Sequence, residues 1–311
     1  MNKPASPLAP DAAYLTVRQA AQYLHLNDKK VYALAASGAI PATKVTGKWL
    51  FPRRLLDDWL HESAHGGLLT DRLMIAGSDD PLLASAVAFL AAELGDSALV
   101  AICPTGTRGG LELLARGRAN ACGIHWGPAG ASDEQHARLL AAYPGHERWA
   151  RVHMARRRQG VILSPGLGPV ADFADLIKRK PRWALRQSGA GSQHFLQSVL
   201  HDHYAAAESL NAVATALSER HAASLVARGR ADCAPGVQSA AQEFALGFLP
   251  LGWEMFDLVV PRPVVFARLF QRLLDLLAGE RLQEIAAGLG GYDLTPLGRV
   301  LDTAPGSTRA E

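Results

Sequence analysis

The chain has 311 residues, 49% of them apolar, with a formal net charge of +3. This length indicates about two or three domains, and the weak net charge requires any nucleic-acid surface to be local. No apolar run reaches the roughly 18 residues of a membrane-spanning helix, and Met1 to Asp11 lack the apolar core of a signal peptide. We therefore expect a cytoplasmic protein.

The cysteines support a reducing compartment. Cys103, Cys122 and Cys233 each stand alone in an apolar run, without the spacing of a metal site or a disulfide framework. Isolated cysteines of this kind behave as small buried side chains. No metal site and no covalently bound cofactor are therefore expected.

After a Pro/Ala-rich segment at residues 1–13, predicted to be disordered, residues 14–61 predict a small helical domain. Thr16 can cap a first helix and Asn27 or Asp28 a second, after a tight turn at His25-Leu26-Asn27. Ser37-Gly38 is typical of a helix end. The expected elements are a helix after Thr16, a helix at Lys29–Ala36, strands at Thr43–Val45 and Trp49–Phe51, and a helix at Arg53–His61.

Positive and aromatic side chains are concentrated on the second helix and the hairpin of this domain. A recognition helix presents its first residues to base edges, and the cations of a wing contact phosphates. The alternative is a solvated basic face on a small helical bundle. The candidate DNA contacts are Arg18, Asn27, Lys29, Lys30, Tyr32, Lys44, Lys48 and Arg53.

The stretch LTVRQAAQYLHLNDKKVYALAASGAIPATKVTGKWLFPRRLLDDWL resembles the excisionase/MerR-like winged helix-turn-helix family. The resemblance covers residues 14–61. It implies that the second helix enters the major groove and that the hairpin is the wing. Residues 62–70, which contain His65-Gly66-Gly67 and no periodicity, are predicted to be a linker.

From Asp71 onward, strand and helix patterns alternate, which predicts an α/β fold with a mostly parallel sheet. Trp149–Ser164 is predicted to be one long extended segment, with an interruption expected near Arg156–Gly160. The other expected strands are Leu73–Ala76, Ala98–Cys103, Ala121–His125, Trp183–Leu185, Ala231–Ala234 and Asp257–Val260. The expected helices are Pro81–Leu94, Leu111–Arg116, Asp133–Ala142, Phe173–Lys178, Phe195–Tyr204, Glu219–Ala227, Val237–Leu246, Val264–Leu277 and Arg281–Ala287.

An internal repeat indicates two lobes. The stretch LLARGRANAC at Leu113–Cys122 recurs as LVARGRADCA at Leu225–Ala234. Both stretches read as a helix end, a glycine stop and a strand start, which favours duplicated structural units. Convergence of unrelated helix-to-strand junctions on the same residues is the alternative.

Each lobe then has two strand-to-helix loops rich in Gly, Ser and Thr. Ligands of open α/β sheets bind beyond the carboxyl ends of strands, where helix N-termini favour anions. The loops predict a cleft for a small anion, with extra charge available from Arg108. His125, at a strand end, either faces this cleft or is structural. The candidate ligand contacts are Ser78, Asp79, Thr105, Thr107, Arg158, Arg186, Ser188, Gly189, Ser192 and His221.

Residues 71–300 resemble periplasmic-binding-protein-like domains that are fused to molybdopterin-biosynthesis proteins and to helix-turn-helix regulators. The resemblance implies a two-lobed type II fold related to molybdate and tungstate binders, with one lobe at 71–156 plus 255–300, the other at 157–254, and a tail at 301–311. Where this family has a Thr-Arg pair, the chain has Ser192-Gln193, so a hydroxyl is kept and a cation is lost. The motifs that carry the likeness are Gly77–Pro81, Gly109–Leu111, Gly123–His125, Arg158–Gly160, Arg186–Ser192, Asp257–Val259 and Gly290–Asp293.

These features together predict a one-component transcriptional regulator that binds double-stranded DNA as a homodimer. The resemblance implies molybdate or tungstate as its leading ligand, followed by a molybdenum-cofactor-related pterin and then a carboxylated metabolite. The alternative is a carrier or sensor module for molybdenum cofactor or a related pterin that does not bind DNA.

Catalysis is not expected. Ser192, with His221 or His125, and Asp79 supply the parts of a nucleophile and a base. However, no Gly-x-Ser-x-Gly elbow occurs, and nothing in the sequence places these residues together. Asp79-Asp80 lack a third metal ligand nearby and are more typical of a helix cap.

Overall fold

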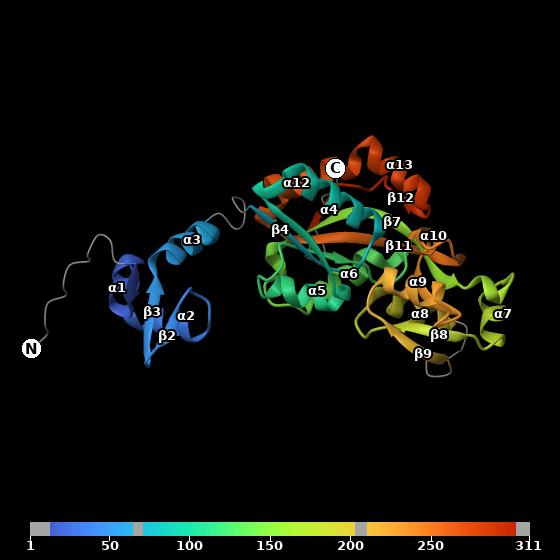
Figure 1. Cartoon of the computed structure of the whole chain (residues 1–311), viewed down its shortest axis with the longest axis horizontal. Helices are drawn as coiled ribbons and strands as arrows, with labels where there is room; N and C mark the ends of the chain where they lie inside the picture. The colour runs from blue at the N-terminus through green and yellow to red at the C-terminus, as the bar shows by residue number, and fades with distance from the viewer. Residues whose placement is uncertain (1–12, 65–70, 203–209, 303–311) are drawn as a thin grey trace, which may run out of the picture. The chain divides into compact units, whose positions relative to one another are not determined.

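The computed structural model describes residues 13–64, 71–202 and 210–302 (Figure 1). The chain forms two compact units, residues 1–70 and 71–311, and each is described by itself. The expectations for the N-terminal segment to residue 12, for positions 65–70 of the linker and for the tail from residue 303 fall outside the described residues. The same holds for the end of the helix expected to reach Tyr204.

The first unit is a winged helix-turn-helix fold. Three helices, α1 (Val17–Tyr23), α2 (Asp28–Ala36) and α3 (Arg53–Ala64), accompany a three-stranded antiparallel sheet. The sheet order is β1 (Tyr14–Thr16), β3 (Lys48–Pro52) and β2 (Thr43–Val45). The expected order of helices and hairpin is confirmed, and β1 is an addition that places Leu15 opposite Phe51.

Local signals explain why these helices begin where they do. Gln19 N–H donates to Thr16 Oγ1, and Thr16 N–H donates to Gln19 Oε1, which completes a capping box at α1. Lys30 N–H donates to Asn27 Oδ1 at 2.8 Å and caps α2. Leu15, Val31 and Phe51 lie in one buried core, which leaves the charged side chains of α2 and the hairpin on the surface.

The second unit is built on one curled, mixed sheet. The strands are β4 (Arg72–Gly77), β5 (Leu99–Pro104), β6 (Ala121–Ile124), β7 (Trp149–Leu163), β8 (Arg182–Arg186), β9 (Asn211–Ala216), β10 (Cys233–Val237), β11 (Gly247–Pro261), β12 (Tyr292–Asp293) and β13 (Val300–Asp302). Their order is β5-β4-β6-β11-β7-β10-β8-β9, and β12 and β13 also pair with β7. Pairing is parallel at the two ends of the sheet and antiparallel around β7 and β11. The expectation of a mostly parallel sheet therefore fails in the middle.

Helices cover this sheet in two groups (Figure 1). One group, with α4, α5 and α12, lies near β4 and β6, and the other, with α8 and α9, lies near β8 and β9. The helices are α4 (Pro81–Leu94), α5 (Gly106–Ala115), α6 (Ser132–Ala141), α7 (Phe173–Lys178), α8 (Gly191–Asp202), α9 (Glu219–Ala227), α10 (Gln238–Glu243), α11 (Arg262–Val265), α12 (Arg268–Ala278) and α13 (Glu280–Leu289), with 3₁₀ turns at Gly95–Ser97, Ala129–Ala131, His146–Arg148 and Pro165–Leu167. None of the helices in the described residues is long and apolar enough to cross a membrane.

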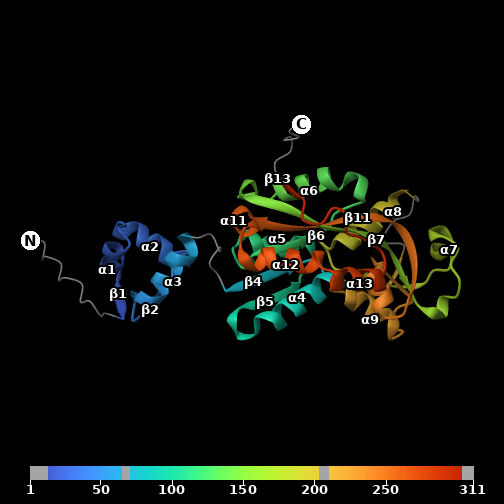
Figure 2. The same cartoon turned by 90° about the horizontal axis from the view of Figure 1, so that it is seen from above.

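The long strands β7 and β11 join two lobes and run side by side (Figure 2). Trp149 lies opposite Pro261 at one end of the pair, and Leu163 lies opposite Gly247 at the other. One hydrophobic core contains Leu82 and Phe256, and a separate core contains Ile162. The fold is therefore the two-lobed fold of periplasmic-binding-protein-like domains.

The interruption expected at Arg156–Gly160 is absent, because β7 continues through these residues. Arg157 points into the protein and is only 1% exposed, whereas Arg156 and Arg158 on either side are partly exposed. The helix expected at Val264–Leu277 is also wrong as one element, since it divides into α11 and α12.

The repeated sequence forms the same junction twice. Arg116 and Arg228 close helices α5 and α9, and the glycines that follow, Gly117 and Gly229, have φ angles of 65° and 66°. Strands β6 and β10 come next. A left-handed glycine ends a helix without a steric penalty, which explains why the two stretches share their sequence.

Candidate functional site

Loops from both lobes meet at the carboxyl ends of the parallel strands. Ser78 Oγ and Thr107 Oγ1 are hydrogen-bonded at 2.8 Å, which ties the loop after β4 to the start of α5. Arg108 N–H donates to Gly189 O at 3.2 Å, and Arg220 N–H donates to Asp79 Oδ2 at 3.1 Å. These two contacts join residues of the two helix groups, so the meeting point of the loops is an interlobe site.

Glu219, the first residue of α9, occupies the centre of the second lobe's loops. Its Oε1 accepts hydrogen bonds from Arg186 Nη1 and Ser192 Oγ, both at 2.5 Å. Its Oε2 is buried without a hydrogen-bond donor among the described residues. The carboxylate is fully buried, so Arg186 and Ser192 hold a negative oxygen group away from water.

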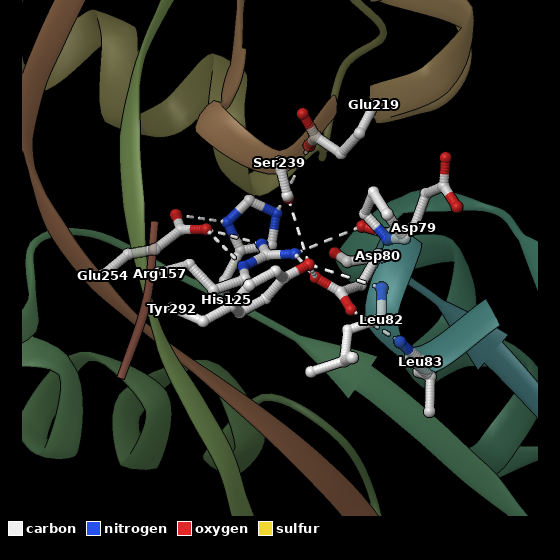
Figure 3. Close-up of polar contacts among 12 residues, drawn as sticks. Asp79, Asp80, Leu82, Leu83, His125, Arg157, Glu219, Ser239, Glu254 and Tyr292 are labelled. Atoms are coloured by element: carbon white, nitrogen blue, oxygen red, sulfur yellow. Dashed lines mark hydrogen bonds and ion pairs between the residues drawn. The ribbon is translucent and has the colours of Figure 1, made fainter. Parts of the chain in front are cut away.

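A second set of charges lies on the other side of His125. His125 Nδ1 is hydrogen-bonded to Glu254 Oε2 at 2.6 Å, and His125 Nε2 lies 3.9 Å from Glu219 Oε1. Arg157 bridges Glu254 Oε1 at 2.5 Å and Asp80 Oδ2 at 2.9 Å. Figure 3 shows these side chains converging. We call Asp80, His125, Arg157, Arg186, Ser192, Glu219, Glu254 and Tyr292 the charge cluster.

Burial and pairing set the charge states of this cluster. Burial alone would raise the pKa of Glu254, but His125 and Arg157 hold that pKa below its usual range. Burial opposes the charge of Arg157, yet Glu254 and Asp80 raise its pKa, so it stays charged. Burial and Asp80 place the pKa of Tyr292 well above 10. The phenol therefore remains a donor, and it donates to Asp80 Oδ2 at 2.8 Å.

The candidate ligand residues fall into two groups. Ser78, Asp79, Thr107, Arg186 and Ser192 are buried at the interlobe site. The others lie around it. Thr105 Oγ1 accepts from Gly77 N–H, Gly189 O accepts from Arg108 N–H, and His221 Nδ1 accepts from Leu217 N–H. Ser188 is exposed, and the Arg158 guanidinium lies 4.8 Å from the centre of the Trp253 ring.

Sequence reasoning missed Glu219, Glu254, Arg157 and Tyr292. The period-2 alternation of a strand was the signal for Arg157, because it puts Arg157 on the opposite face from Arg156 and Arg158. Glu219 and Glu254 carried no comparable signal. Their partners Arg186 and Arg157 lie 33 and 97 residues away in the chain.

The arrangement does not assemble the nucleophile and base considered from the sequence. Ser192 Oγ donates to Glu219 and accepts from Gln159 Nε2 at 2.8 Å, while His125 is bound to Glu254. His221 is engaged within its own loop. Within the described residues, no group of three metal-ligating side chains could hold a metal ion.

The candidate DNA contacts of the first unit are mostly open to solvent. Arg18, Lys29, Lys30, Tyr32, Lys44 and Lys48 are exposed. Asn27 uses its side-chain oxygen as the cap of α2. The Arg53 guanidinium lies 5.2 Å from the centre of the Tyr23 ring. The start of α2 and the β2–β3 hairpin therefore present the available cations.

Comparison with known families finds two matches. A model described as "PBP superfamily domain" matches residues 89–278, which is more than half of the chain. A model described as "Helix-turn-helix domain" matches residues 14–64. The helix-turn-helix domain indicates DNA binding, and the PBP-like domain indicates ligand sensing, which together favour a regulator or binding protein over an enzyme.

Individual relatives are distant or short. A Clostridium pasteurianum protein described as "Uncharacterized protein in ferredoxin 2Fe-2S gene 5'region" is 34% identical over 80 residues, which cover 25% of this chain and 71% of the relative. A hydrogen-peroxide-bound variant of OxyR from Corynebacterium glutamicum has a TM-score of 0.52 at 16% identity, covering 88% of this chain and 90% of its own. The OxyR likeness shows a shared fold. A tungstate ABC transporter protein from Geobacter sulfurreducens has a TM-score of 0.48 at 14% identity, covering 70% and 97% of the two chains.

The Arg157–Glu254 pair gives the first testable prediction. Glu254→Gln leaves the Arg157 charge buried with one carboxylate fewer, which should lower the free energy of unfolding by about 3–5 kcal/mol. Arg157→Met should cost a similar amount, and the double variant should lose less than the sum. Urea unfolding followed by circular dichroism measures all three.

The exposed Glu112–Arg116 pair, at 3.9 Å, is the matched control. The same cycle there should give a coupling below about 0.5 kcal/mol. Equal coupling at both pairs would contradict the view that burial gives the Arg157–Glu254 pair its strength.

Proposed function

Because the chain belongs to the PBP superfamily and carries a helix-turn-helix domain, we propose that it is a one-component transcriptional regulator that senses a small anion in the interlobe site. The supporting observation is that Arg186 and Ser192 both donate hydrogen bonds to the Glu219 carboxylate. Charge-assisted bonds from a guanidinium and a hydroxyl suit an anionic oxygen group.

Molybdate or tungstate is the leading ligand under this proposal, by the resemblance of residues 71–300 to molybdate and tungstate binders. A molybdenum-cofactor-related pterin is second and a carboxylated metabolite third. The ligand takes the position of Glu219 against Arg186 and Ser192, with Ser78 and Thr107 across the site. A ligand changes the equilibrium between two arrangements of the lobes only to the extent that it binds one arrangement more tightly than the other.

On the DNA side, α2 is the proposed recognition helix and the β2–β3 hairpin the wing. Lys29, Lys30 and Tyr32 are exposed on α2, and Lys44 and Lys48 are exposed on the hairpin. A single module of this size makes few base contacts, so a homodimer on paired half-sites is part of the proposal.

A carrier or sensor module for molybdenum cofactor or a related pterin is the second candidate. Exposed apolar side chains on the first unit favour it, because Tyr14, Leu55 and Leu60 are 60%, 49% and 40% exposed. Such side chains suit a protein partner as well as DNA. In a protein with this second function, the first unit would show no salt-dependent affinity for duplex DNA.

DNA binding is tested with Lys29→Ala/Lys30→Ala in the full chain. The variant should bind duplex DNA at least about 10-fold more weakly at moderate salt. The slope of log affinity against log salt should become shallower by up to about 2, because two cations that neutralise phosphate charge near the DNA are lost. Fluorescence anisotropy across a salt series gives both quantities, and calorimetry should show unchanged ligand affinity.

Arg116→Ala/Arg118→Ala is the control, since it removes the same charge from exposed positions of the second unit. If the α2 variant binds DNA as the wild type does, α2 is not the recognition helix. If the wild type shows no salt-dependent DNA binding, the carrier function is favoured instead.

Anion binding is tested by calorimetric titration of the full chain with molybdate and with tungstate. Heat and a rise in melting temperature are expected with at least one of them. Ser192→Ala, which removes a hydroxyl donor, should weaken binding about 10-fold, the equivalent of one hydrogen bond. Ser198→Ala on the same helix should not. The absence of heat and thermal shift with both anions would remove them as ligands.

A further inference from the structure

An open groove of about 420 Å³ lies beside the charge cluster. Its residues Arg108, Trp126 and His194 closely follow Thr107, His125 and Ser192 in the chain. The groove is lined by Arg108, Trp126, Gln135, Arg138, Leu139, Ala142, Tyr143 and His194. We propose that this groove is a second binding site, which takes a planar aromatic carboxylate. The proposal depends neither on the ligand of the interlobe site nor on DNA binding.

The groove presents donors that have no acceptor. The Arg108 guanidinium lies 5.2 Å from the centre of the Trp126 ring and forms no ion pair with a described carboxylate. The His194 ring stacks on Trp126 with 4.3 Å between centroids and 11° between planes, and its nitrogens have no hydrogen bond among the described residues. Stacking therefore holds two nitrogen donors in place, and the planar guanidinium matches a carboxylate.

The rest of the lining favours a ligand with a flat, partly polar ring system. Leu139 and Ala142 supply apolar surface, and Trp126 and Tyr143 supply aromatic surface. Gln135 Oε1 is buried without a donor, so a hydroxyl or amino group on the ligand would satisfy it. The volume suits a compound of one or two rings.

Charge separates this groove from the charge cluster. The cluster already contains three buried carboxylates, those of Asp80, Glu219 and Glu254. The groove has Arg108 and Arg138 as cations; within the part of the chain that the structure describes, Arg138 forms an ion pair with Glu134 at the surface and Arg108 forms none. An anion too large to replace Glu219 therefore finds its unpaired cation in the groove.

The groove also bridges the two lobes. Arg108 belongs to α5 and His194 to α8, on opposite sides of the Arg108–Gly189 contact. A carboxylate held by both side chains would favour the closed arrangement of these helices. It would also affect His194, whose pKa is lowered by burial and by the charge of Arg108. A bound anion counteracts the Arg108 charge and raises that pKa.

Calorimetry of the full chain with salicylate tests the site. Salicylamide, which is neutral, and cyclohexanecarboxylate, which is not planar, are the matched probes. Salicylate should bind at least 10-fold more tightly than either probe. Arg108→Gln should weaken salicylate binding at least 10-fold. Arg116→Gln, at the C-terminal cap of the same helix and outside the lining, should leave it unchanged. Absence of salicylate binding at millimolar concentration, or equal binding by Arg108→Gln and the wild type, would overturn the proposal.

A wild-type measurement keeps the test independent of the variant's folding. Titration of His194 by nuclear magnetic resonance should show a higher pKa with saturating salicylate than with salicylamide. An unchanged His194 pKa in the presence of bound salicylate would place that ligand elsewhere and overturn the proposal.

Discussion

The buried ion pairs of the charge cluster are the constraint on which the second unit depends. Taking a carboxylate or a guanidinium out of water costs several kcal/mol, and the structure offsets this cost by pairing each buried charge with a partner. Arg157 on β7 needs Asp80 at the start of α4 and Glu254 on β11. Arg186, the last residue of β8, needs Glu219 on α9. We infer that the main effect of the charge cluster is to favour one arrangement of the lobes, and that its net contribution to the free energy of unfolding is small.

The same constraint connects the fold to sensing. A site that buries a carboxylate against Arg186 and Ser192 has the chemistry to hold a free anion, provided that Glu219 leaves. Exchange of one anion for the other keeps the arginine paired while the surroundings change. The protein then has two states, one with Glu219 in the site and one with the ligand in the site, and ligand binding shifts the equilibrium toward the second. The exposed cations of α2 and the hairpin are the proposed DNA contacts through which a change of state would affect DNA binding.

Features that depend on neighbours in the chain were predictable. Thr16 and Asn27 mark helix starts through bonds to residues three positions on, and Gly117 and Gly229 mark helix ends. The winged helix-turn-helix fold, the two lobes and several loop residues followed from such signals. The antiparallel pairing of β7 with β11 joins residues about a hundred positions apart. The burial of Arg157 and Glu219 depends on tertiary context of this kind, so the sequence did not identify them as site residues.

The central claim is that Glu219 occupies the position of the ligand anion. Calorimetric titration of tungstate or molybdate into the wild type and into Glu219→Gln tests it most directly, because the variant keeps the shape of the side chain and removes its charge. The account predicts at least about 10-fold tighter anion binding by Glu219→Gln, or about 1.4 kcal/mol. Unchanged or weaker binding by a folded variant would contradict it.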